Sequence, residues 1–208
     1  MDDFAAALTK LWPHGDQHIT GLVSGLIAAA PAIFPKYGID GNQTIAHAMA
    51  QFSHECAAGL EMVENMNYSA AGLQRTWPTR FGADRANRYA HNPQMIADSV
   101  YGGRMGNAPP PSHDGWNFRG RGLSQVTGRE GYDKLAQATG LDLTNQPDLV
   151  NDPGHALECG VADFIICKCL DPAKADNVKE VTHRLNGGYI GLAERIAWLR
   201  RWKQELGI

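Results

Sequence analysis

The chain has 208 residues, of which 43% are hydrophobic and 20% are charged, and its formal net charge is −3. A chain of this length can bury a core without staples, and its small net charge creates no global field that would draw it to nucleic acid or to an anionic membrane. The N-terminal run MDDFAAALTK begins acidic and lacks the basic-then-apolar order of a secretory signal. The most apolar run, residues 21–34, is too short to cross a bilayer and contains Pro31. We therefore expect a protein made in the cytoplasm, without nucleic acid as a partner and without stable membrane insertion.

Apolar residues recur mainly with the 3.6-residue period of α-helices. In chain order, we expect helices over residues 3–11, 17–30, 42–57, a stretch from 70 that Pro78 breaks, 85–90, 94–100, 127–139, 152–168, 177–185 and 191–205. Strand signals are few. Residues 101–126 could contain a small β-hairpin, but no other segment indicates β structure. The expected class is mainly α, with little or no β structure.

Local signals indicate where several of these helices begin and end. Pro31 is expected to end the second helix and Gly59 the third. Ser69 is a candidate N-cap, the run from Thr127 to Glu130 has the pattern of a capping box, and Asp152 before Pro153 predicts a helix start. The last helix carries basic residues that we expect on a solvated face: Arg195, Arg200, Arg201 and Lys203.

The four cysteines do not indicate a disulfide framework, which belongs to short secreted domains. They are Cys56, Cys159, Cys167 and Cys169. Their spacing fits no zinc pattern. We expect buried free thiols and no metal site, with one disulfide pairing as the alternative.

Residues 101–126 are rich in glycine and proline and predict a long irregular loop. Ordered loops of this length in compact domains are usually functional. The alternative is a flexible connector, but Tyr101, Trp116 and Phe118 are aromatic side chains that a connector would leave unused. We therefore expect this loop to contribute to a binding site.

Two glutamates are the first candidates for chemistry. Glu55 lies at the edge of an apolar helix face and near the helix C-terminus, and both influences raise a carboxyl pKa, as a general acid requires. Glu64 follows beyond Gly59. Two carboxylates across a cleft are the minimum needed to cleave a glycosidic bond, since one protonates the leaving oxygen and the other activates water or attacks carbon. On spacing alone Glu61 competes with Glu64, and either glutamate could instead be an ordinary surface residue.

Four groups of residues occur in an order typical of one enzyme family. They are FSHE at 52–55 with ENMNYS at 64–69, YGGRMGN at 101–107, FRGRGLSQVT at 118–127 with Tyr132 downstream, and NGG at 186–188 with AERI at 193–196. Together they resemble glycoside hydrolase family 19, the plant-type chitinases and related phage endolysins, and above all its endolysin branch. The resemblance covers residues 42–204. It implies a lysozyme-like fold with a cleft between two lobes, and hydrolysis with inversion of configuration that needs no metal or organic cofactor.

The resemblance also assigns roles by motif match. Glu55 would be the general acid, Glu64 rather than Glu61 the general base, and Thr127 would position the attacking water. Matching positions that would bind substrate or organise the site are His54, Tyr68, Gln125, Asn186 and Arg195, and Arg195 could also pair with a catalytic carboxylate.

Other interpretations of these side chains stay open. Gln125 could simply satisfy backbone groups of its loop, and Thr127 could cap the following helix. Among the aromatic residues, Tyr101 and Trp116 are the better candidates for stacking on a sugar ring. We expect the other large rings in the core: Trp77, Trp198 and Trp202.

Three departures from the plant enzymes put chitin in doubt as the substrate. Ala57 stands where chitinases often have a small hydroxyl residue, and Gly131 stands where they tend to have a sugar-binding asparagine. The residues after 186–188 also lack the acidic residue and the longer loop of the plant enzymes.

We therefore expect residues 1–208 to form a single catalytic domain, with N-terminal helices (1–41) packed on it and no separate wall-binding module. The expected activity is that of a monomeric phage endolysin, a lysozyme that cuts peptidoglycan after a holin-type protein releases it to the periplasm and cell wall. The alternatives are a chitinase, a non-catalytic aminosugar-binding protein and a secreted antibacterial effector.

Overall fold

The computed structural model describes residues 2–208, which form twelve α-helices and two short 3₁₀ helices. Their bounds are α1 (Asp2–Leu11), α2 (Leu22–Lys36), α3 (Asn42–Glu55), η1 (Ala57–Gly59), α4 (Ala70–Thr76), α5 (Ala83–Tyr89), α6 (Pro93–Tyr101), α7 (Asp114–Asn117), α8 (Arg129–Thr139), η2 (Pro147–Asn151), α9 (Ala156–Ile166), α10 (Leu170–Lys174), α11 (Val178–Asn186) and α12 (Leu192–Glu205). Within these residues, extended pairing is limited to the isolated bridges Val63–Arg121 and Arg121–Val126. The expected mainly α class is confirmed.

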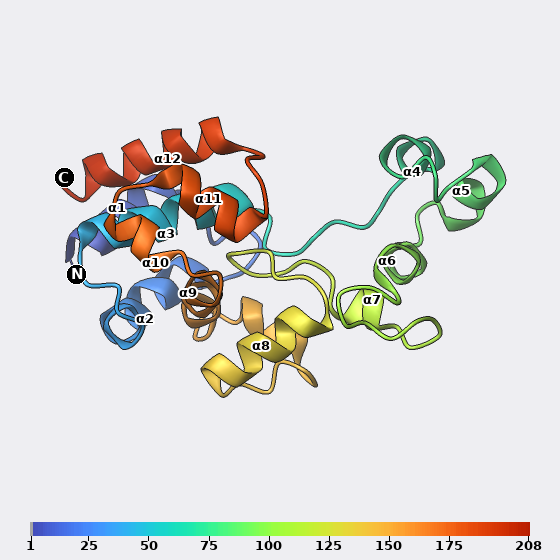
Figure 1. The fold of residues 1–208 in the computed structure, drawn as a ribbon, viewed down its shortest axis with the longest axis horizontal. Helices are drawn as coiled ribbons and strands as arrows, with labels where there is room; N and C mark the ends of the chain where they lie inside the picture. Colours follow the sequence, from blue (N-terminus) through green and yellow to red (C-terminus); the bar gives the residue numbers. More distant parts are fainter. Residues whose placement is uncertain (1) are drawn as a thin grey trace.

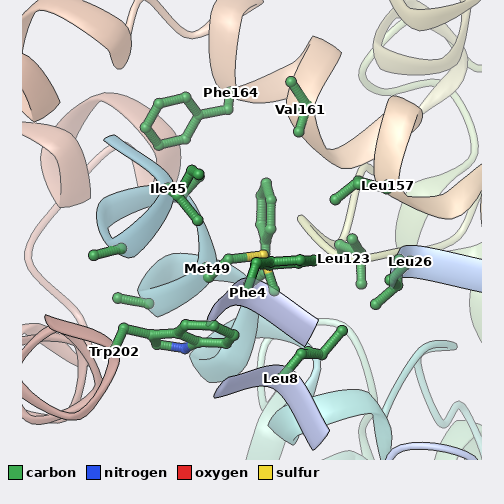
Figure 2. Packing of buried hydrophobic residues seen from close by; sticks show 14 of the residues in the cluster. Phe4, Leu8, Leu26, Ile45, Met49, Leu123, Leu157, Val161, Phe164 and Trp202 are labelled. Atoms are coloured by element: carbon green, nitrogen blue, oxygen red, sulfur yellow. The ribbon is translucent and has the colours of Figure 1, made fainter. Parts of the chain in front are cut away.

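The larger lobe is built around α3, whose residues 44–53 are all buried. Helices α1, α2 and α9–α12 surround it (Figure 1). Figure 2 shows the shared core, in which Phe4 of α1 lies against Trp202 of α12, with ring centroids 6.1 Å apart. Phe4 also meets Phe34 of α2 edge to face at 5.2 Å. The N-terminal helices therefore bury their apolar faces in the same core as the C-terminal helix.

Two further apolar clusters complete the fold. One joins α8, η2 and the outer side of α9, with Tyr132, Val150 and Ala162 at its centre. The other belongs to a smaller lobe made of α4–α7, which stands apart from the rest in Figure 1 and packs around Leu73, Phe81 and related residues.

Two irregular segments, residues 60–69 and 118–127, connect the lobes and pair with each other. The Gly122 amide donates to the Met62 carbonyl at 2.9 Å, and the Glu64 amide donates to the Gly120 carbonyl at 2.9 Å. This pairing fixes the backbone of the segment that carries Glu64.

Helix α2 corrects the expected second helix. It begins at Leu22 and continues through Pro31 and Pro35 to Lys36. Each internal proline removes one backbone donor, but the helix buries a stripe at four-residue spacing, formed by Leu22, Leu26, Ala30 and Phe34. Burial of this stripe against α9 outweighs the lost hydrogen bonds, because packing of an apolar face provides most helix stability in proteins.

The expected capping box at residues 127–130 is wrong. Helix α8 starts at Arg129, and the Thr127 hydroxyl donates to the Gln125 carbonyl at 2.9 Å instead of capping. The first amides of α8 are satisfied from the preceding loop, since Arg129 donates to Asn107 Oδ1 at 2.8 Å and Glu130 donates to the Met105 carbonyl. A long-range contact thus replaces the local cap.

Other local expectations have mixed outcomes. Ser69 caps α4 by accepting from the Gly72 amide at 3.1 Å, as predicted. Asp152 does not start a helix directly, because its carboxylate closes a turn onto the Gly154 amide and α9 begins only at Ala156. The loop 101–126 contains the short helix α7 and no regular hairpin.

The cysteines are free thiols, as expected. Burial raises the pKa of Cys56, Cys159 and Cys167 to about 12, so these thiols stay protonated at neutral pH. No helix within residues 2–208 combines the length and apolarity that crossing a bilayer requires.

A buried histidine in α3 predicts a pH-dependent stability. His47 Nε2 lies 2.8 Å from Asp176 Oδ1, and the Lys203 ammonium also contacts Asp176. Burial lowers the pKa of His47 despite Asp176. Because the unfolded chain takes up this proton below about pH 6.5 while the folded chain resists it, stability is expected to fall as pH drops through that range. Urea unfolding at pH 7.5 and 5.5 should show a smaller loss for His47→Gln than for the wild type; equal losses would contradict this assignment.

Candidate active site

Glu64 lies where the two connecting segments pair, and both of its carboxylate oxygens accept hydrogen bonds. The Tyr101 hydroxyl donates to Oε1 at 2.6 Å, and the Gly120 amide donates to Oε2 at 3.2 Å. Burial and the bond to Glu64 raise the pKa of Tyr101, which keeps its hydroxyl a protonated donor. The long loop predicted over residues 101–126 thus supplies both donors, the Tyr101 hydroxyl and the Gly120 amide, that orient the Glu64 carboxylate.

The Tyr101 hydroxyl is expected to matter for turnover. Tyr101→Phe removes the donor to Glu64 while keeping the ring, and a hydrogen bond to a charged group contributes about 1.5–3 kcal/mol. We expect kcat to fall about tenfold with KM little changed, measured by steady-state hydrolysis of a soluble glycan. A variant with unchanged kcat would show that this contact does not position Glu64.

Three predicted site residues converge on Gly120. A Cβ atom at this position would lie 3.2 Å from Gln125 Oε1, 3.3 Å from Glu64 Cβ and 3.3 Å from Thr127 Oγ1. The glycine therefore leaves the room in which the Glu64, Gln125 and Thr127 side chains meet. The close approach of these three side chains to the backbone explains why the motif at residues 118–127 has a glycine at position 120.

Adding one methyl group at this point should disturb the site more than the fold. In Gly120→Ala the new Cβ would press on all three neighbours at distances tighter than ordinary van der Waals contact. We expect kcat/KM to fall at least about tenfold and stability to fall by about 1–3 kcal/mol, the usual effect of overpacking. Parallel kinetics and urea unfolding check this, and full activity would mean that the three side chains need no exact spacing.

Gln125 takes one of the two roles that were left open, that of satisfying backbone groups of its loop. Its backbone is left-handed, with φ of 56°. Its Nε2 donates to the carbonyls of Glu61 and Gly122 at 3.0 Å each, so it does satisfy loop backbone groups. Its Oε1 remains directed toward Gly120. The side chain thereby ties the segment that carries Glu64 to the 118–127 segment.

Glu55 is the last residue of α3, and its side chain is 19% exposed. Its Oε1 accepts from Arg195 Nη2 at 2.5 Å. Arg195 is 1% exposed and also donates to Gln51 Oε1 and to the Ile190 carbonyl. The expectation that Arg195 belongs to a solvated basic face is therefore wrong, because its guanidinium is enclosed between α3 and the loop before α12. The alternative expectation paired Arg195 with one of the two candidate glutamates, and the carboxylate that Arg195 contacts is that of Glu55.

His54 and Asn186 lie around that same loop, residues 187–191. The exposed Asn186 donates to the Ile190 carbonyl at 3.2 Å. The His54 ring fits so closely over Gly191 that a Cβ there would lie 2.2 Å from Nε2. Burial and the nearby Arg195 lower the pKa of His54, so it is neutral at pH 7. These residues border the Glu55 side of the site.

An open hollow of about 730 Å³ lies beside Glu64. Its walls are residues 60–65, Tyr68, Gln125, His18 and Ile19. Tyr68 also packs edge to face on Trp77 at 5.0 Å, and burial raises its pKa. Sequence reasoning misses His18 and Ile19, because no motif covers the segment before α2.

Trp116 does not line this hollow. Its ring packs on the core of the smaller lobe, and the Arg119 guanidinium covers it at 3.6 Å from the ring centroid. Trp202 is buried, and Trp77 and Trp198 are partly buried against apolar clusters, as expected. Within residues 2–208, no cluster of three His, Cys, Asp or Glu side chains is placed to hold a metal ion.

Comparison with known proteins gives the family. No family model matches the chain. A "Glycosyl hydrolase family 19 domain-containing protein" of Haemophilus influenzae is 34% identical over 188 residues, which covers 89% of this chain and 88% of that protein. An "Inactive chitinase-like protein 1" of Hevea brasiliensis and an "Acidic 27 kDa endochitinase" of Solanum lycopersicum are each 30% identical over 60% of this chain, and over 35% and 38% of their own lengths.

Solved structures agree with the expected fold. A bacterial family 19 chitinase superimposes with a TM-score of 0.65 at 21% identity, covering 98% of this chain and 94% of that one. Chitinase C from Streptomyces griseus gives a TM-score of 0.59 at 17% identity, over 97% and 91% of the two chains. The lysozyme-like fold is thereby confirmed. The Haemophilus influenzae relative extends the sequence similarity to 89% of this chain. The chain is a glycoside hydrolase and belongs to glycoside hydrolase family 19.

Proposed function

We propose that this enzyme is an endolysin-type lysozyme that hydrolyses β-1,4 glycosidic bonds of bacterial peptidoglycan by an inverting mechanism with two glutamates. The observation that carries the proposal is the different anchoring of the two carboxylates. Glu64 stands on the wall of an open hollow and accepts from the neutral donors Tyr101 and Gly120. Glu55 is held by the enclosed cation of Arg195.

In the proposed reaction, Glu55 donates a proton to the glycosidic oxygen as the bond to the anomeric carbon breaks. Arg195 contacts Glu55 through Oε1, which leaves Oε2 to carry that proton. Glu64 removes a proton from a water molecule that attacks the anomeric carbon from the opposite face. The two carboxyl groups are expected roughly 6.5–9.5 Å apart, the spacing that accommodates such a water.

Thr127 is proposed to position this water. Its hydroxyl donates to the Gln125 carbonyl at 2.9 Å, so its oxygen lone pairs are available to accept from the water. His54, Tyr68, Tyr101, Gln125, Asn186 and Arg195 are proposed to bind the substrate or organise the site. For Trp116, covered by Arg119, stacking on a sugar would require the other face of its ring.

Peptidoglycan is favoured over chitin by the three departures from the plant enzymes. Ala57 has a left-handed backbone, with φ of 46°, in the turn after α3. At Gly131, even a Cβ atom would lie 2.9 Å from Val126 Cγ2, so the asparagine typical of chitinases does not fit without a shift. A chitinase of the same mechanism is the second candidate, favoured by the likeness to a plant endochitinase and to a bacterial family 19 chitinase.

The biological setting is part of the proposal. Residues 1–208 would act as one catalytic domain, in keeping with the shared core of α1 and α12. The enzyme is further proposed to be a monomer. As in the endolysin branch that its motifs resemble, the enzyme would reach the periplasm and cell wall through a holin-type protein and lyse the host. A secreted antibacterial effector would use the same chemistry, and co-purification with an immunity protein would reveal that case.

Lysis of outer-membrane-permeabilised Gram-negative cells, with mass analysis of the released fragments, tests the activity. We expect lysis by the wild type and fragments that end in reducing aminosugars, which also identify the bond. Released free peptides would contradict a glycosidase. Cleavage of chitin oligomers without lysis would indicate the chitinase, and binding without cleavage of either polymer would indicate a sugar-binding protein.

A further inference from the structure

A second hollow continues from the one that contains Glu64. It has a volume of about 670 Å³, and Ile19 and Val63 line both hollows. Its far wall is formed by residues 145–149, 151 and 152, most of which belong to η2. The two hollows therefore form one surface path that leads from Glu64, across Val63, to η2.

The far wall is fixed relative to the catalytic segment. The Gly122 amide donates to Asn151 Oδ1 at 3.0 Å, and the buried Arg121 guanidinium lies 2.7 Å from Asp148 Oδ1. Gly122 and Arg121 belong to the same segment as Gly120, which anchors Glu64. A ligand held by η2 would thus be held at a set distance from Glu64.

The chemistry of this wall suits a neutral sugar. Carboxamide groups of Asn145, Gln146 and Asn151 stand beside apolar surface from Val63 and Leu149. Gln146 is exposed. The Asn145 amide donates to Asp142 Oδ1 at 2.9 Å and to Oδ2 at 3.2 Å, so its own carbonyl oxygen is the group that Asn145 offers to a ligand. Carboxamides match sugar hydroxyl and N-acetyl groups, and apolar surface matches the sugar ring face and the acetyl methyl.

The charges on the wall argue against the other part of peptidoglycan, the peptide. Asp148 and Asp152 both line the second hollow. The Arg121 guanidinium, which is 3% exposed, already pairs with Asp148. A peptide carboxylate would meet like charges there, which disfavours its binding.

We propose that the second hollow is a distal subsite that binds a neutral N-acetylhexosamine unit of the same glycan strand that is cut at Glu64. The proposal rests on the proposed glycosidase function and extends it to an additional sugar position. Asn145 and Gln146 would be the residues that determine how strongly longer glycans bind.

The test uses Glu55→Gln protein, so that the glycan is not consumed, and β-1,4-linked N-acetylglucosamine trimer and hexamer as probes. By calorimetry, adding Asn145→Ala and Gln146→Ala should weaken hexamer binding about tenfold, as loss of two hydrogen bonds predicts. The trimer should lose much less, because it can bind beside Glu64 alone. Gln204→Ala, at an exposed position of α12, is the matched control and should leave both affinities unchanged. Thermal unfolding checks that the double variant stays folded.

A direct readout complements the affinities. In nuclear magnetic resonance spectra, the Gln146 side-chain amide signals should shift when the hexamer is added. Absence of that shift, or equal losses for trimer and hexamer, would overturn the subsite. A shift caused by a peptide-bearing wall fragment but not by the neutral hexamer would overturn it in favour of a peptide site. Because the wall-lysis assay is separate, a protein that binds the hexamer as expected but does not lyse walls would refute the proposed function and leave the subsite standing.

Discussion

Glu64→Gln is expected to lower kcat for glycan hydrolysis by at least about 100-fold, the lower end of what a general base contributes. The amide cannot take a proton from water, yet it keeps the size of the side chain and an oxygen that can accept from Tyr101. The fold should therefore survive, and circular dichroism and thermal unfolding should match the wild type. Steady-state kinetics on a soluble glycan measure the effect.

Glu61→Gln is the matched control for this variant. Glu61 lines the same hollow as Glu64, and its backbone carbonyl, which accepts from Gln125, is kept in the variant. We expect its kcat to stay within about twofold of the wild type. If Glu61→Gln and Glu64→Gln lose activity equally, or if only the former does, the assignment of Glu64 as the base is wrong.

The second large effect is expected at Arg195. Arg195→Met removes a buried cation that contacts Glu55, Gln51 and the Ile190 carbonyl. Loss of one partner of a buried pair costs about 3–5 kcal/mol, because the remaining charge stays in a poorly solvated position. We expect a loss of this size in urea unfolding, together with a strong loss of activity.

Two further variants test whether this loss is specific to the Arg195–Glu55 pair. Arg200→Met changes an exposed arginine on the same helix and should alter stability by no more than about 0.5 kcal/mol. Combining Arg195→Met with Glu55→Gln should restore part of the lost stability, because no uncompensated carboxylate remains. Additive losses in the combined variant would mean that Arg195 stabilises the fold mainly through Gln51 and the backbone.

The sequence predicts local features best where local signals decide the structure. Ser69 caps α4 because its hydroxyl reaches an amide in the first turn, and α3 ends at Glu55, close to the expected position. The motif residues Glu64, Gln125 and Thr127 do meet, at Gly120. That these three side chains lie close together could be predicted from the order of the motifs and the family resemblance. The periodicity of apolar residues alone does not predict it.

The features that the sequence does not predict depend on contacts between distant segments. Helix α2 tolerates two prolines because its apolar stripe is buried. Thr127 does not cap α8 because Asn107 already satisfies the Arg129 amide. Arg195 is enclosed because α3 offers Gln51 and Glu55 as partners. From sequence alone, a charged side chain on a helix is expected to be exposed to solvent. Only the structure shows the polar partners that allow it to be buried.

The anomeric form of the first product is the most direct test of the two-glutamate mechanism. Proton nuclear magnetic resonance, recorded within the first minutes of cleavage of a β-linked aminosugar glycan, distinguishes the two anomers before they equilibrate. A water activated by Glu64 on the face opposite the leaving group must produce the α-anomer first. If the β-anomer appears first, the reaction retains configuration, and the proposed roles of Glu55 as general acid and Glu64 as general base are wrong.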